Sequence, residues 1–293
     1  MIAIGGGSVI DAGKAIAALL TNPGDPLDYM EVVGRGMPLA NPPVALIAVP
    51  TTAGAGAEVT RNAVIKSGVH RVKASIRSSH LLPRVAVVDP ELTHVLPPAT
   101  TASTGLDALT QLIEPYVSVH ANAMTDQFCV EGMRAAAWAL RRAFRNGGDR
   151  EARAAMSWAS LLGGMALANA GLGIVHGFAA PIGGSYAAPH GAVCAALLPH
   201  AMEVNLRAIR GRDARFVVVA RLLTGNPHAS GEEGVAWVAD LCRELEVPPL
   251  RAYGIGAADV PELCRLATEA SSTKGNPVPL SASEMAEILS RAL

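Results

Sequence analysis

The sequence predicts a two-part protein, with an α/β unit at the N-terminal end followed by an all-helical domain. Short apolar or β-branched runs separated by turn residues occupy the first third of the 293 residues. The stretch Leu96-Pro97-Pro98 then marks a boundary, beyond which nearly every segment has helical periodicity. Because a single core stops growing near roughly 250–300 residues, we expect an α/β domain over residues 1–96 and a helical domain over residues 97–293.

The first third contains several runs with the composition of strands. Met1–Ile4 leads into a glycine-rich turn and then into Ile10–Leu20, which has helical periodicity, so a strand–turn–helix unit is expected there. The remaining runs are rich in β-branched residues and are bounded by turn residues or proline. They are Val44–Val49, Asn62–Ile65, Arg71–Ile76 and Arg84–Val88.

Helices are predicted throughout the second part. The first of them should bend near Pro115, because proline interrupts the hydrogen bonding of a helix interior. The last opens with Ser281 and carries Glu284 three residues later, the signature of a capping box. The predicted helices are Thr101–Val119, Met124–Phe144, Asp149–Ala170, His190–Asn205, Asp213–Leu223, Glu232–Leu245, Val260–Ser271 and Ser281–Arg291.

The composition argues against several classes of protein. Charged residues make up 17% of the chain and the formal net charge is −1, so neither disorder nor a charged surface for nucleic acid or an anionic membrane is expected. The four cysteines are scattered without CxxC spacing. This pattern argues against a disulfide framework or a zinc ribbon and favours a reducing cytoplasm.

From Ala154 to Met202 the chain has no Asp, Glu, Lys or Arg. A membrane hairpin is one interpretation of such a run. Against it, the run contains His176, His190 and many glycines, and has no stretch of about 18 strongly apolar residues. We therefore expect a pair of helices buried on all sides within the helical domain.

Two glycine-rich loops are candidates for binding phosphate groups. Gly5-Gly6-Gly7-Ser8 lies between a predicted strand and a helix, where glycines allow close backbone approach, Ser8 can cap the helix and the helix N-terminus attracts anions. The loop Pro50–Glu58, which contains Thr51 and Thr52, has the same form. At the ends of neighbouring strands the two loops would hold one diphosphate. Plain connections in an alanine-rich chain are the alternative.

Two charged residues follow the first loop. Asp11 and Lys14 lie at helical spacing beyond the glycines. They are compatible with a role beside a bound nucleotide, and equally with a solvated first helical turn.

A second set of polar residues lies on one predicted helix. Asp107 and Gln111 are one turn apart and share a face, and Glu114 lies on that face one turn further. His176 and His190 both fall within the uncharged run. Two histidines and a carboxylate can form a divalent metal site with an open position for a substrate oxygen. Two satisfied core histidines are the alternative interpretation.

The segment between the two histidines contains Pro181, Gly183 and Gly184. These residues interrupt helices and permit turns. We expect them to turn the chain back, so that His176 and His190 can approach each other.

Taken together, these motifs resemble the iron-containing (group III) alcohol dehydrogenases, a sister group of glycerol dehydrogenases and dehydroquinate synthases. The resemblance implies a Rossmann-like nucleotide-binding domain, incomplete in this chain, joined to a helical domain in a dehydroquinate synthase-like architecture. The matching segments occur in order along the chain. They are Gly5–Ser8 with Asp11 and Lys14, Pro50–Glu58, Val88–Thr93, Ser103–Thr110, Glu114 with Tyr116–Ser118, Val175–Gly177, Pro189–Gly191, Leu198–His200 and Asn276–Pro277.

The resemblance implies an NAD(P)-dependent oxidoreductase that interconverts an alcohol and an aldehyde or ketone, with Fe²⁺ or Zn²⁺ polarising the substrate oxygen. Its partner would be a small molecule, not nucleic acid or a membrane, and we expect a cytoplasmic homo-oligomer, a dimer. The implied cofactor-binding residues are Gly5, Gly6, Gly7, Ser8, Asp11, Thr51, Thr52 and Lys73. The implied metal ligands are Asp107, Gln111, His176 and His190.

This chain departs from the family pattern at three chemically important positions. Gln111 stands where a histidine ligand is usual, and its neutral amide should lower the metal affinity. Ala180 stands where a histidine near the nicotinamide is frequent, so a proton relay there must use water or be lost. Cys194 replaces a usual asparagine one helical turn after His190, and we do not expect it to be a ligand.

Two alternatives to a metal-dependent dehydrogenase stay open. One is a metal-independent enzyme similar to maleylacetate reductases, which Gln111 favours and Asp107 disfavours, since those proteins tend to have asparagine there. The other is a non-catalytic remnant, because the family has further strand–helix units before the strand at which this chain starts. Among the explanations for that start, we expect a gene start set too far downstream, in preference to a true truncation or an oligomer that covers the sheet edge.

Overall fold

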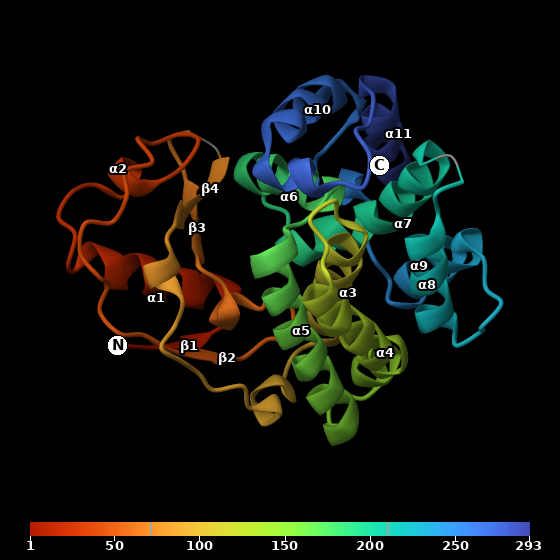
Figure 1. The fold of residues 1–293 in the computed structure, drawn as a ribbon, viewed down its shortest axis with the longest axis horizontal. Coiled ribbons are helices and arrows are strands. Elements are labelled where there is room, and N and C mark those ends of the chain that lie inside the picture. Colours follow the sequence, from red (N-terminus) through yellow and green to blue (C-terminus); the bar gives the residue numbers. More distant parts are fainter. Residues whose placement is uncertain (71, 210) are drawn as a thin grey trace.

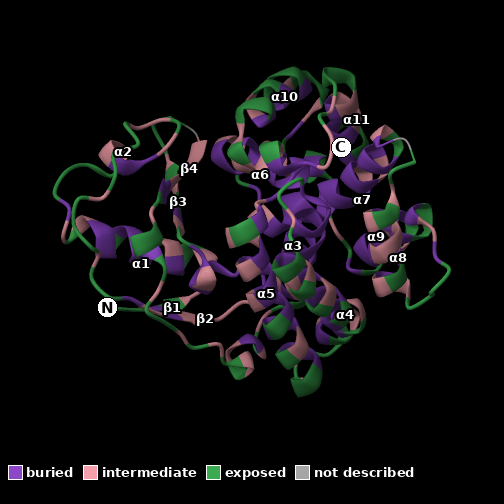
Figure 2. Cartoon of the chain, viewed as in Figure 1, coloured by how far each residue is buried: buried purple, intermediate pink, exposed green. Residues whose placement is uncertain are grey.

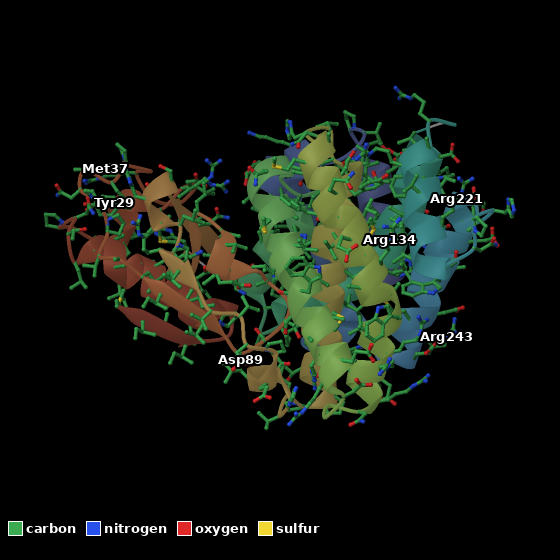
Figure 3. The ribbon with its side chains drawn as sticks, turned by 60° about the horizontal axis from the view of Figure 1, so that its bottom comes forward. Tyr29, Met37, Asp89, Arg134, Arg221 and Arg243 are labelled. Carbon is green, nitrogen blue, oxygen red and sulfur yellow. The ribbon has the colours of Figure 1, made fainter. Side chains whose placement is uncertain are left out.

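The computed structural model describes residues 1–70, 72–209 and 211–293. In Figure 1 the strands gather with α1 (Gly7–Leu19) and α2 (Pro26–Tyr29) on one side, and the helices from α3 (Pro98–Val117) onward lie on the other. Asp89 lies where the chain passes between the two parts (Figure 3). The predicted order, an α/β unit and then helices, agrees with this architecture. The domain boundary at residue 96 stays a prediction.

A short parallel sheet forms the centre of the first part, in the order β1-β2-β5. Its strands are β1 (Ile2–Gly5), β2 (Ile47–Pro50) and β5 (Val85–Ala86), with Ile2 opposite Ile47 and Ile47 opposite Val85. Helix α1 covers one face, where a Cβ on Gly13 would come within 2.8 Å of the Cβ of Ala3. On the other face the side chains of Ile2 and Ile4 are 62% and 61% exposed.

An antiparallel hairpin accompanies this sheet. It consists of β3 (Asn62–Ser67) and β4 (Val72–Arg77), paired from Asn62–Arg77 to Ser67–Val72. Both strands agree with the sequence prediction within two residues, although Arg71, the first residue of the predicted Arg71–Ile76 strand, lies outside the described residues. Ile76 of β4 packs with Met30 in a small core separate from that of the helices.

Helix α3 lies at the centre of the second part and packs against α4, α5 and α7. Leu106 and Leu112 are fully buried on it, and Figure 2 shows the buried residues concentrated around this helix. The surrounding helices are α4 (Ala123–Arg145), α5 (Arg150–Ala170), α6 (Ile174–Ser185), α7 (His190–Ala208), α8 (Ala214–Thr224), α9 (Gly231–Glu244), α10 (Val260–Glu269) and α11 (Ala282–Ala292).

The segment between the two histidines differs from the sequence expectation. Pro181, Gly183 and Gly184 do not turn the chain but lie within α6, and the turn falls between Ser185 and His190. Helix α6 packs against α7, α10 and β4. This tertiary packing outweighs the low helix propensity of proline and glycine.

The uncharged run from Ala154 to Met202 forms most of α5, all of α6 and much of α7. Most of its residues are buried, as expected, but they form three helices and not the predicted pair. Within the described residues no single helix is long and apolar enough to cross a membrane. The pair α5 and α6 reaches that length and composition only when joined, and it is bent by 100°.

Lys14 is the most deeply buried charged side chain of the first part, at 1% exposure. Its ammonium group donates to the carbonyl oxygen of Thr60 at 2.8 Å, the hydroxyl of Thr60 at 2.9 Å and the carbonyl oxygen of Asn62 at 2.9 Å. All three N–H bonds are therefore used to tie α1 to the start of β3. The solvated first turn that the sequence allowed is wrong for Lys14.

Replacing Lys14 should destabilise the protein. Lys14→Met leaves the Thr60 and Asn62 carbonyl oxygens without their donor, so the free energy of unfolding should fall by about 1–3 kcal/mol. Urea denaturation followed by circular dichroism measures it. Lys66→Met, on the exposed face of β3, is the control and should change stability by less than about 0.5 kcal/mol. Equal losses in the two variants would contradict this role for Lys14.

Asp11 lies beside Lys14, with its Oδ1 atom 3.8 Å from the Lys14 Nζ atom. Burial raises the pKa of the Asp11 carboxyl to about 6, and Lys14 only partly opposes this effect. Between about pH 4, the value for an unfolded chain, and pH 6, the folded state retains a proton that the unfolded state releases. This carboxyl therefore makes folding less favourable as the pH rises through that window.

Asp11→Asn should remove that pH dependence. The unfolding free energy of the variant minus that of the natural protein should rise by about 2–3 kcal/mol from pH 4 to 6 and then level off. Lys14, with a pKa of about 8, stays protonated over this range, so loss of the ion pair adds only a constant offset. Urea titrations at a series of pH values measure the difference, and parallel stability curves would disprove the burial of this carboxyl.

Candidate active site

The two glycine-rich loops lie side by side at the carboxyl ends of β1 and β2. The Thr51 backbone N–H donates to the Gly5 carbonyl oxygen at 3.0 Å. A Cβ on Gly6 would contact the Thr52 hydroxyl at 3.4 Å. The prediction that the loops follow neighbouring strands is therefore confirmed.

Ser8 does not cap α1. The helix begins at Gly7 with Gly6 as its N-cap residue, and no side chain accepts a hydrogen bond at this end. Ser8 lies within the first turn, two residues after the capping position. The first N–H groups of α1 consequently lack a side-chain acceptor, which is the state in which a helix N-terminus binds an anion.

A cleft of about 1320 Å³ separates the α/β part from the helices. This volume exceeds the ~300–1,000 Å³ of a typical small-ligand pocket. Gly5 and Thr51 are not among the described residues that line it. The predicted site residues that do line it are Gly6, Gly7, Ser8, Asp11, Thr52, Lys73, Asp107, Gln111, His176 and His190.

Asp107, His176 and His190 come together on the helical wall of the cleft. The Nε2 atom of His176 lies 3.4 Å from the Asp107 Oδ1 atom, and the Nε2 atom of His190 lies 3.8 Å from it. These residues belong to α3, α6 and α7. A Cβ on Gly191 would lie 2.2 Å from the Ser103 carbonyl oxygen, so only glycine allows α7 to begin this close to α3.

The polar atoms of this cluster are incompletely satisfied. Among the described residues, the buried side-chain nitrogen or oxygen atoms without a hydrogen-bond partner are Asp107 Oδ1 and Gln111 Oε1. Gln111 donates its amide to the Gly54 carbonyl oxygen at 3.3 Å, which leaves its oxygen unused. An unpaired buried carboxylate oxygen is costly, and a cation removes that cost. The donor set therefore fits a divalent metal.

Glu114 orients one of the histidines. Its Oε1 atom accepts the Val175 backbone N–H at 2.7 Å, and its Oε2 atom lies 2.6 Å from the His176 Nδ1 atom. A carboxylate in this position accepts a hydrogen bond from Nδ1 and turns Nε2 toward Asp107, where that nitrogen can bind a cation once it has lost its proton. Carboxylates that bind the outer ring nitrogen of a metal-binding histidine fix its tautomer and its orientation.

The pKa values of the cluster residues reflect the electrostatic attraction between the histidines and their acidic neighbours. Burial alone would lower the pKa of His176, but the neighbouring thiol and carboxyl groups hold it well above its usual value. Burial would raise the pKa of Asp107, but the two imidazoles lower it below its usual value. The site therefore favours positive charge next to the Asp107 carboxylate.

Two residues of this site have roles that the sequence does not predict. The helix periodicity puts Glu114 on the same face as Asp107 but gives it no role, because its partner His176 is 62 residues away. Cys194 is not expected to be a ligand, yet its Sγ atom lies 3.8 Å from the Nε2 atoms of both His176 and His190. The spacing of four residues from His190 is its signal in the sequence.

Lys73 approaches the cleft from β4. A Cβ on Gly183 of α6 would lie 3.2 Å from the Lys73 Nζ atom, so the lysine stem packs against that helix. Burial lowers the pKa of Lys73 and nearby Lys66 adds to the effect. Ala180 lines the same wall and supplies no proton-transfer group.

Two family profiles match the chain. Residues 1–90 match "iron-containing alcohol dehydrogenase" and residues 101–293 match "Fe-containing alcohol dehydrogenase family, C-terminal". Alcohol dehydrogenase 4 of Schizosaccharomyces pombe is 39% identical over 100% of this chain and 68% of its own length. The 1,3-propanediol dehydrogenase of Klebsiella pneumoniae is 37% identical over 100% of this chain and 75% of its own length.

The structural comparison agrees. The alcohol dehydrogenase from Oenococcus oeni superposes with a TM-score of 0.92 and 36% identity, over 100% of this chain and 76% of that chain. The chain thus spans about two thirds to three quarters of the length of these relatives. Both halves of the sequence and the whole described fold lead to one assignment. The chain belongs to the iron-containing alcohol dehydrogenase family of oxidoreductases, as its motifs predict.

Proposed function

We propose that the protein interconverts a short alcohol and its aldehyde or ketone, with NAD(H) bound along the two glycine-rich loops and a divalent metal bound by Asp107, His176 and His190. The observation that carries the proposal is the unpaired Asp107 Oδ1 atom beside two histidine Nε2 atoms, on the wall of a cleft that also contains the N-terminus of α1. When bound, the metal supplies Lewis acidity toward the substrate oxygen and the nicotinamide exchanges the hydride.

The cofactor phosphates and the substrate would bind at opposite ends of the cleft, each held by different residues. Gly6, Gly7 and Thr52 allow a pyrophosphate to reach the first N–H groups of α1, and Ser8 and Asp11 lie beside it. At the other end the metal-binding residues hold the substrate oxygen in place. Lys73, between the two parts, supports the bound cofactor with its charge.

The substrate class follows from the walls around the metal-binding residues. Ala180, Pro181 and Ala188 line the cleft next to the histidines, and they favour a small, weakly polar molecule. Two relatives are named as an alcohol dehydrogenase and a 1,3-propanediol dehydrogenase, and 1,3-propanediol is a molecule of this kind. We therefore propose a short primary alcohol or diol and its aldehyde as the reacting pair.

Further features of the proposal concern the metal, the cofactor and the assembly. Gln111 would contribute its unused amide oxygen as a weak ligand. The metal would be Fe²⁺ or Zn²⁺, and the nicotinamide cofactor NAD or NADP. A homodimer is also part of the proposal. Four free, buried cysteines support a cytoplasmic location. The maleylacetate reductase-like and non-catalytic alternatives are not favoured, because the relatives are named dehydrogenases.

Metal removal tests the proposal. After dialysis against a strong chelator, NADH oxidation with a short aldehyde should fall by at least about 10²-fold, because Lewis-acid polarisation supplies several kcal/mol at the transition state. Activity should return when Fe²⁺ or Zn²⁺ is added without oxygen. Asp107→Ala should abolish both metal content and activity, whereas Asp240→Ala, exposed on α9, should change neither. Full turnover in the metal-free protein would show that the metal is not required.

Glu114→Gln tests the orientation of His176. The amide cannot hold the Nδ1 proton as the carboxylate does, so the affinity for the metal should fall about 10–100-fold. Competition against a chelator of known affinity measures it, and circular dichroism checks the fold. Glu131→Gln, exposed on α4, is the matched control and should bind metal like the natural protein. Unchanged affinity in Glu114→Gln would remove Glu114 from the site.

A further inference from the structure

We infer that Cys194 is a protein ligand of the metal and that the site consequently selects Zn²⁺ over Fe²⁺. This inference rests on the metal site proposed above and deepens it, since it concerns a residue that replaces the asparagine usual in similar chains. Cys194 would also supply a fourth strong metal donor, which the weak neutral ligand Gln111 does not provide.

The positions of the donor atoms carry the inference. One atom from each of Asp107, His176, His190 and Cys194 lies within 4.8 Å of all the others. The Cys194 Sγ atom is 3.8 Å from each histidine Nε2 atom, and the Asp107 Oδ1 atom is 3.4 Å and 3.8 Å from the same two nitrogens. A tetrahedral zinc site with bonds of ~2.0–2.3 Å has edges of about 3.3–3.6 Å. Small side-chain shifts would bring all four atoms to bonding distance.

An independent observation favours a cation between these four donor atoms. Asp107 is 4% exposed and its Oδ1 atom, on the side of the two imidazoles, has no hydrogen-bond partner. A structural thiol would not explain this atom. A cation bound among the four donors satisfies it, and the Cys194 thiol loses its proton to the solvent on binding.

The place of Cys194 is compatible with catalysis. Its side chain is fully buried, on the protein side of the cluster, whereas His190 is partly exposed to the cleft. With four protein donors the zinc tetrahedron would be complete, so a substrate oxygen would add from the cleft side as a fifth ligand. Catalytic zinc sites can expand to five ligands in this way.

The donor set decides the preferred metal. A thiolate is a soft ligand and suits Zn²⁺, and two imidazoles also suit it. Zn²⁺ already binds more tightly than Fe²⁺ to most nitrogen, oxygen and sulfur sites. With Asp107 and Cys194 both ionised, the two negative charges of the site balance the ion. A chain with asparagine at this position has one charge fewer and no soft donor.

X-ray absorption of the zinc-loaded natural protein tests the inference without any variant. The extended fine structure should contain a sulfur scatterer at ~2.3 Å beside nitrogen and oxygen scatterers at ~2.0 Å. The cobalt-loaded protein should show a thiolate-to-cobalt charge-transfer band. Both signals should disappear in Cys194→Asn and persist in Cys242→Ser, which changes another buried cysteine, one that donates to the Ala195 carbonyl oxygen.

Affinity gives a second readout. In Cys194→Asn and Cys194→Ser the affinity for Zn²⁺ should fall at least about 10-fold, since loss of even an outer-shell partner costs that much. The ratio of zinc to iron bound from an equimolar oxygen-free mixture should fall with it. Metal bound only by nitrogen and oxygen, with unchanged affinity in both variants, overturns the inference but leaves the proposed function intact. Natural protein that binds no stoichiometric metal overturns both.

Discussion

The structure around the site depends on one buried charge. Asp107 lies in the middle of α3, next to helix segments of the uncharged run. Its Oδ1 atom has no hydrogen-bond partner, although two histidine nitrogens lie within 3.8 Å. Ionised carboxylates are rarely buried unless paired. The imidazoles of His176 and His190 compensate this negative charge only in part, whereas a divalent cation would compensate it fully. Because the uncharged run has no Asp, Glu, Lys or Arg, it adds no further charge next to the Asp107 carboxylate.

Tight packing gives these groups fixed positions. Glu114 ties the start of α6 to α3 through Val175 and orients His176 by the same carboxylate. Gly191 allows α7 to begin against the backbone of α3. On the other side of the cleft, Lys14 ties α1 to β3, so that the helix N-terminus faces the cluster from a rigid support. Preorganised sites lose little free energy to reorganisation when the substrate binds.

Local patterns in the sequence predicted the parts of the fold that local physics determines. The strand–glycine–helix unit at Gly5–Ser8 and the helix face of Asp107, Gln111 and Glu114 follow from turn chemistry and periodicity. Helix α6 could not be predicted, because its proline and glycines are held helical by neighbouring elements. The proximity of Cys194 to His176 was likewise hidden, since it arises only when α6 packs on α7.

The central claim is that Asp107, His176 and His190 enclose a divalent metal at the floor of a nucleotide cleft. Anomalous diffraction at the zinc and iron absorption edges, from crystals of the natural protein grown with NADH, tests it directly. The account predicts one strong anomalous peak within ~2.0–2.3 Å of the Asp107 and histidine donor atoms, with the nicotinamide in the same cleft. Ordered NADH with no anomalous peak among these side chains would contradict it.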